Sequence, residues 1–133
     1  MHIGAMVNDV QKVLDNLSAE HGEFVLAMLH NSDSLSSTYY WHLIVSAPWT
    51  DEMGTFEAIR LIADALHDGM SIENQPAISR IRVLKSSDPL VRDMTFLYPE
   101  VPPGPAVPLS QIRAGDLTEG GAFIFHSRKP TAA

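Results

Sequence analysis

Two apolar segments separated by a polar turn constrain the fold of this chain more than any other feature. Residues Phe24–His30 and Tyr39–Ala47 are rich in apolar, aromatic and β-branched side chains, and Asn31–Ser34 is typical of a turn. We expect the two segments to form an antiparallel hairpin at the centre of a sheet. Both faces of this hairpin are mainly apolar, whereas a strand with one face in water alternates apolar and polar residues. Helices or a second subunit must therefore cover both faces.

The expected turn fixes which residues share a face. A hairpin turning at residues 34 and 35 sets His30 opposite Tyr39 and Leu26 opposite Leu43. In this register His30 and His42 lie on opposite faces, so we do not expect their rings to bind one metal ion.

Helical periodicity predicts three helices around the hairpin. Apolar residues recur every three or four positions from Met6 to Leu17. A second helix is expected from Thr50 or Thr55 to about Asp68, and Asp88–Pro89 is typical of the start of a short third helix. The predicted inward stripe of the second helix consists of Phe56, Ile59, Ile62, Ala63 and Leu66.

Two further strands complete the expected order α-β-β-α-β-α-β. They are Ile78–Leu84 and Ala122–Ser127. This order predicts an α+β fold, or an α/β sandwich, in which helices pack on a mixed sheet of about four strands. The helical crossover between Tyr39–Ala47 and Ile78–Leu84 should make these two strands parallel. We expect residues 1–133 to form a single domain.

A proline-rich segment separates the body of the chain from its last strand. Prolines stand at every third position from residue 99 to residue 108, with one more at Pro103. A three-residue period matches one turn of a polyproline II helix, so residues 99–108 are expected to form a stiff arm of about 30 Å. The arm either reaches a partner subunit or wraps its own domain.

Composition excludes several classes of protein. The 133 residues contain no cysteine, which excludes disulfides and thiolate chemistry. The net charge of −7, with nine basic residues, argues against a general nucleic-acid binder. No apolar run approaches 18 residues and no signal peptide is evident at Met1–Met6, so we expect a soluble cytoplasmic protein without membrane partners.

Two strand-to-helix junctions are the best candidates for a ligand site. Ligands of open α/β sheets bind beyond the carboxyl ends of parallel strands, and the amides that begin the helix at Asp88 suit an anion. The alternative is that these residues only cap helices and form turns, with Trp49 closing the core. The candidate ligand-binding residues are Ser46, Trp49, Thr50, Asp51, Ser86, Ser87 and Asp88.

Other chemistry finds little support in the sequence. The six histidines fit no recognised metal-ligand spacing, and no nucleotide-binding or nucleophile motif is present. We therefore predict no metal and no cofactor, and the catalytic residues stay unassigned. Arg80 and Arg82 alternate along one side of a strand, where they could bind an anionic ligand, pair across an interface or face solvent.

Two functions remain open. The favoured hypothesis is a small non-catalytic binding or assembly protein that forms a homodimer. The alternative is a small enzyme that acts on an anionic metabolite at the junctions Ser46–Asp51 and Ser86–Asp88. The sequence identifies neither a substrate nor a partner.

Overall fold

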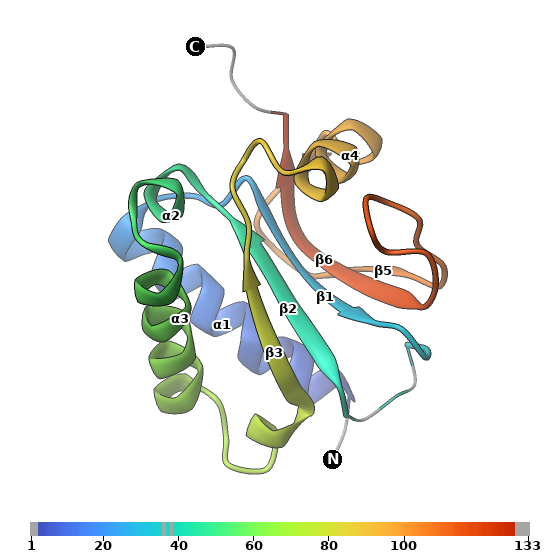
Figure 1. The fold of residues 1–133 in the computed structure, drawn as a ribbon. Helices are drawn as coiled ribbons and strands as arrows, with labels where there is room; N and C mark the ends of the chain where they lie inside the picture. The colour runs from blue at the N-terminus through green and yellow to red at the C-terminus, as the bar shows by residue number, and fades with distance from the viewer. Residues whose placement is uncertain (1–2, 36, 38, 130–133) are drawn as a thin grey trace.

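A mixed sheet lies between two layers of helices in the computed structural model, which describes residues 3–35, 37 and 39–129 (Figure 1). The ends of the predicted 1–133 domain lie outside the described residues. The described elements are α1 (Ile3–His21), β1 (Leu26–Asn31), β2 (Trp41–Ser46), α2 (Pro48–Glu52), α3 (Thr55–Gly69), a 3₁₀ turn (Gln75–Ala77), β3 (Ile78–Val83), α4 (Pro89–Leu97), β4 (Glu100–Val101), β5 (Val107–Leu109) and β6 (Gly121–Arg128).

The predicted α+β class is confirmed. The described part of the chain contains six strands instead of about four, because the proline-rich segment contributes the short strands β4 and β5. The strands lie in the order β3-β2-β1-β6-β4, and β5 also pairs with β6. Strands β2 and β3 are parallel, as the helical crossover predicts, and the other pairs are antiparallel. The edge of the sheet next to β2 is formed by β3.

The predicted hairpin register is wrong by three residues. In the structure Leu26 lies opposite Ser46 and His30 lies opposite His42. Strand β2 begins only at Trp41, because Tyr40 has a φ of 67°, in a left-handed region that interrupts an extended strand. His30 and His42 therefore share one face of the sheet, contrary to the expectation from the sequence.

Side-chain hydrogen bonds fix this longer turn. Asn31 Nδ2 donates to the carbonyl of Tyr39 at 2.8 Å, and Asn31 Oδ1 accepts from the amide of Asp33 at 2.8 Å. The buried indole of Trp41 donates to the carbonyl of Ser37 at 2.9 Å. These bonds satisfy polar groups of the turn and favour the observed register over the shorter turn.

Helices α1 and α3 cover one face of the sheet (Figure 1). The sheet residues buried beneath them include Leu29, Trp41 and Leu43. Strand β6 has an irregularity opposite Ala27 and Met28, and its Phe125 joins this same core. The buried residues of α1 are Met6, Val7, Val10, Val13, Leu14 and Leu17.

Helix α4 and the segment 112–117 cover the other face. Helix α4 begins as predicted, because the Asp88 carboxylate accepts from the amide of Leu90 at 2.9 Å and Pro89 occupies the first turn. Leu90 and Met94 of this helix belong to the same buried cluster as Met28 of β1, and this cluster forms a second core. Both faces of the central strands are therefore covered within one chain.

The predicted inward stripe of α3 is partly wrong. Ile62 and Leu66 are buried as expected, but Phe56 is 89% exposed and Ile59 and Ala63 are only half-buried. The helix begins after Gly54 and presents Ala58 to the core, so its apolar residues span a wider arc than one buried stripe. Ile59 and Ala63 lie on the side of α3 next to the edge strand β3, whereas Phe56 projects into solvent.

The proline-rich segment follows β6 of its own chain. Val101 pairs with Ser127 and Val107 pairs with Ile124, so six positions of the segment correspond to three positions of the strand. A straight polyproline arm would advance about 19 Å over those six positions, against about 10 Å for the strand. The segment therefore bends near Gly104, where φ is 154°, and lines a small cavity together with Leu14 of α1, which differs from the straight arm expected.

We expect burial to separate two chemically identical substitutions. Ile62→Ala should lower the free energy of unfolding by about 2–5 kcal/mol, because Ile62 is fully buried between α3 and the sheet. Ile72→Ala should change it by less than about 0.5 kcal/mol, since Ile72 is 85% exposed. Urea denaturation followed by circular dichroism measures both, and equal effects would contradict the described core.

Candidate functional site

The parallel arrangement of β2 and β3 brings the two strand-to-helix junctions together. The hydroxyl oxygens of Ser46 and Ser86 lie 3.5 Å apart. Ser86 Oγ donates to Asp51 Oδ2 at 2.6 Å, and the Ser86 amide donates to Asp51 Oδ1 at 3.1 Å. Lys85 Nζ donates to the carbonyl of Asp51 at 2.6 Å. The junctions Ser46–Asp51 and Ser86–Asp88 are thus joined by hydrogen bonds between residues of the two loops.

The remaining polar residues of the junctions bond within their own loops. Thr50 Oγ1 accepts from the amide of Ala47 at 3.0 Å and donates to its carbonyl at 2.9 Å. The Asp88 carboxylate caps α4 through Leu90, and Ser87 is exposed. The hydrogen bonds of the junctions hold the two loops in place. They also occupy amide and hydroxyl groups that could otherwise bind an anion.

Trp49 contacts the end of α1 instead of the two serines. Its ring stacks on His21 with centroids 4.8 Å apart and packs against Phe24 at 5.6 Å. Its indole nitrogen donates to the carbonyl of Gly22 at 2.9 Å. Each of these contacts closes the end of the core, which agrees with the alternative role considered for Trp49.

A group of basic side chains on the α4 face of the sheet was missed because the register was misjudged. His30 and His42 are neighbours across β1 and β2, and His42 lies opposite Arg80 of β3. Burial, then His30, Arg80 and Arg82, lower the pKa of His42. His30 Nε2 lies 2.8 Å from the carbonyl oxygen of Glu119.

These histidines have too few neighbouring ligands for a metal site. Across residues 3–35, 37 and 39–129, no group of three or more histidine or acidic side chains is placed to hold a metal ion. Two imidazoles alone fall short of the three or four ligands of a typical protein zinc site.

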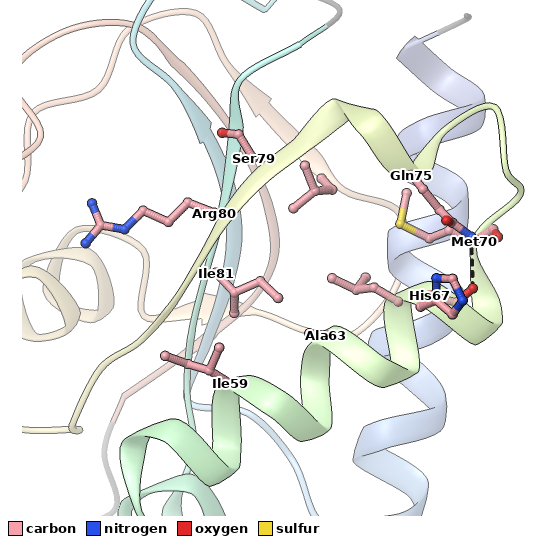
Figure 2. A pocket seen from close by; sticks show the side chains of 10 residues that line it. Ile59, Ala63, His67, Met70, Gln75, Ser79, Arg80 and Ile81 are labelled. Atoms are coloured by element: carbon pink, nitrogen blue, oxygen red, sulfur yellow. Dashed lines mark hydrogen bonds between the residues drawn. The ribbon is translucent and has the colours of Figure 1, made fainter.

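An apolar groove of about 290 Å³ lies between α3 and β3 (Figure 2). Ile59 and Ala63 of α3 line one side, and Ile78 and Ile81 of β3 line the other. Ile59 and Ala63 were expected on the inward stripe of the second helix, and Ile78 and Ile81 in the third strand. The signal available was the width of the apolar arc of α3, which exceeds what one buried stripe requires.

The end of this groove is held by hydrogen bonds. Gln75 Nε2 donates to the carbonyls of His67 and Met70, at 2.9 and 3.1 Å. Asn74 Nδ2 donates to Asp9 Oδ2 of α1 at 2.8 Å, and this bond is the main cause that lowers the pKa of Asp9. The loop between α3 and β3 is therefore fixed to both helices, and the groove is preformed.

His126 is a buried titratable group on the opposite side of the molecule. It lies beside a small cavity of about 20 Å³, which Pro103 and Gly104 of the proline-rich segment also line. Neither ring nitrogen makes a hydrogen bond of good geometry within the described part of the chain, although backbone groups of Val101 and Phe24 lie close enough to favour the charged ring. Burial lowers the pKa of His126, and the carboxylate of Glu23 opposes this effect.

Comparison with models of protein families, with curated proteins and with solved structures finds no match in any of the three. Among the described helices, none has both the length and the apolar character needed to span a lipid bilayer.

We expect Ser86 to stabilise the fold through Asp51. Ser86→Ala removes the 2.6 Å hydrogen bond and should lower the free energy of unfolding by about 1–2 kcal/mol. Ser87→Ala makes the same chemical change on an exposed neighbour and should have an effect below about 0.5 kcal/mol. Urea denaturation compares the two, and a stable Ser86→Ala variant would show that the contact is dispensable for folding.

Acid should destabilise the protein through His42 and His126, because burial lowers the pKa of both side chains. The pKa values of His42 and His126 lie below the ordinary 6.5, so the unfolded chain binds these protons more readily than the folded one. Their contribution to stability is present above about pH 6.5 and is lost as the pH falls below it. We expect His126→Leu to lose less stability than the unmodified chain between about pH 7 and pH 5, as measured by urea denaturation at each pH. An unchanged pH dependence of the free energy of unfolding would show that His126 does not contribute to the loss of stability in acid.

Proposed function

We propose that this chain is a small, non-catalytic binding or assembly protein of the cytoplasm. The observation that carries the proposal is the preformed apolar groove beside β3, whose outer side pairs with none of the described strands. Apolar grooves of this kind are typical of sites that receive a partner. The polar groups of the strand-to-helix junctions, in contrast, bond to one another.

We further propose that the protein forms a homodimer with the segment 99–108 near the interface. Phe96 and Leu97 lie three and two positions before this segment and are 80% and 52% exposed, and Val107 within it is also exposed. Exposed apolar side chains next to a strand that ends a sheet are typical of a subunit contact. This surface lies at the opposite edge of the sheet from β3.

The alternative function, an enzyme acting on an anionic metabolite, has weaker support. It would place the anion at the junctions Ser46–Asp51 and Ser86–Asp88. The Asp51 carboxylate already accepts two hydrogen bonds from Ser86, and Asp88 already caps α4. A bound anion would meet both negative charges, which disfavours it at this position.

Light scattering tests the homodimer. At micromolar concentration we expect a mass twice the 14.6 kDa of the chain. Phe96→Glu should shift the mass toward the monomer, because it places a charge in an apolar contact. Ile72→Glu, an equivalent change at another exposed apolar residue, should leave the dimer intact.

Truncation is unsuitable as a test of this segment. Removing the chain from Pro99 onward would also remove β6, which pairs with β1 along Leu26–Asn31.

In the light-scattering experiment, a mass of 14.6 kDa at every concentration would contradict the dimer. A dimer that Phe96→Glu leaves unchanged would place the interface elsewhere.

A further inference from the structure

Strand β3 ends the sheet without a neighbour on its outer side among the described strands. The amide of Leu84 donates inward to the carbonyl of Val45 at 3.0 Å. Because backbone groups of successive residues point to alternate sides of a strand, Ile81 and Val83 direct their N–H and C=O groups to the free edge. This edge can therefore accept one more strand.

The apolar groove runs along this free edge. Figure 2 shows Ile59 of α3 and Ile81 of β3 pointing into it. Phe56 lies three positions before Ile59 on α3 and extends the same helical row into solvent. An extended segment paired with β3 would direct every second side chain into the groove. With a volume of about 290 Å³, the groove suits a few apolar side chains.

The opposite face of the same edge carries positive charge. Arg80 is exposed, points away from the groove in Figure 2, and takes part in no ion pair with a described residue. Arg82 pairs at 3.1 Å with the exposed Asp116. The two arginines also contribute to the lowered pKa of His42 beside them. A positive face is notable on a chain whose net charge is −7.

We propose that the edge of β3 and the adjoining groove bind an extended peptide segment of a partner protein, in which apolar residues alternate with acidic ones. The inference rests on the proposed binding function and specifies the partner's chemistry. The apolar side chains fill the groove beside Ala63, and the peptide backbone pairs with Ile81 and Val83. The acidic side chains lie on the other face, within reach of Arg80.

The same charges disfavour a second copy of this chain as the occupant. Two β3 strands related by a two-fold axis at Ile81 keep their α3 layers on one side of the joined sheet. This pairing sets Arg80 of each copy opposite Arg82 of the other. Like charges directly opposite each other destabilise a pair of strands. The arginines therefore disfavour pairing of two β3 strands and favour an acidic segment.

Fluorescence anisotropy with two short peptides tests the charge preference. The probe is fluorescein-labelled Glu-Ile-Glu-Val-Glu with a C-terminal amide, and the control peptide has lysine in place of each glutamate. We expect the acidic peptide to bind at least about tenfold more tightly than the basic one. Arg80→Glu should weaken its binding by about tenfold, because it replaces an attraction by a repulsion. Arg92→Glu makes the same change of charge on the exposed side of α4 and should not alter binding.

A second pair of variants tests the groove. Ala63→Leu fills the groove and should weaken binding of the acidic peptide by about tenfold. Ala19→Leu adds the same side chain to an exposed position of α1 and should have no effect. In ¹⁵N-labelled protein, the acidic peptide should cause its largest amide shifts at Ile81 and Val83.

Three results would overturn the inference: equal affinity for the two peptides, largest shifts away from β3, or no binding at about 1 mM peptide. Hydrogen exchange adds a separate check on the free protein. Slow exchange of the Ile81 and Val83 amides in a dimer would mean that a second copy occupies the edge. That result would refute the peptide site while leaving the proposed assembly function in place, whereas a monomer that binds the acidic peptide would refute only the homodimer.

Discussion

The burial of β1 on both of its faces determines how the rest of this chain is arranged. All six residues of Leu26–Asn31 are buried, and apolar residues of the strand contribute to two separate cores. Burying an aliphatic side chain stabilises the fold by about 1.5–3 kcal/mol, so neither face can be left to water without a large loss. Helices α1 and α3 supply one cover, and α4 with residues 112–117 supplies the other.

The two edges of the sheet are treated differently. On the β6 side, the bent proline-rich segment covers the edge with two short strands, and its prolines interrupt further pairing. On the β3 side, no described strand pairs with the outer edge, and this strand carries Arg80 and Arg82. Charged residues limit indiscriminate pairing while still permitting a partner of opposite charge. One edge of the sheet is therefore protected from further strand pairing, whereas the other can pair with a partner of opposite charge.

Much of this architecture could be predicted from local patterns. The capping pair Asp88–Pro89, the apolar period of α1 and the crossover between β2 and β3 each depend on a few neighbouring residues, and each prediction is confirmed. The hairpin register depended on the positive φ of Tyr40, which the sequence does not signal. That error separated His30 from His42. Likewise, the stripe of α3 could not show which of its apolar residues face the core and which face a groove, because both kinds share one helical arc.

The position of β6 has a consequence for how the chain folds. Asn31 and Gly121, which lie opposite each other in β1 and β6, are 90 positions apart in the sequence. The entropy lost on closing a loop rises with the logarithm of its length, and the loss precedes most of the contacts that offset it. A folding chain must therefore hold the apolar edge of β1 open until its last described strand arrives. Pairing over such a separation slows folding relative to a fold built from local contacts, and until β6 has paired, the exposed edge of β1 can pair with another chain.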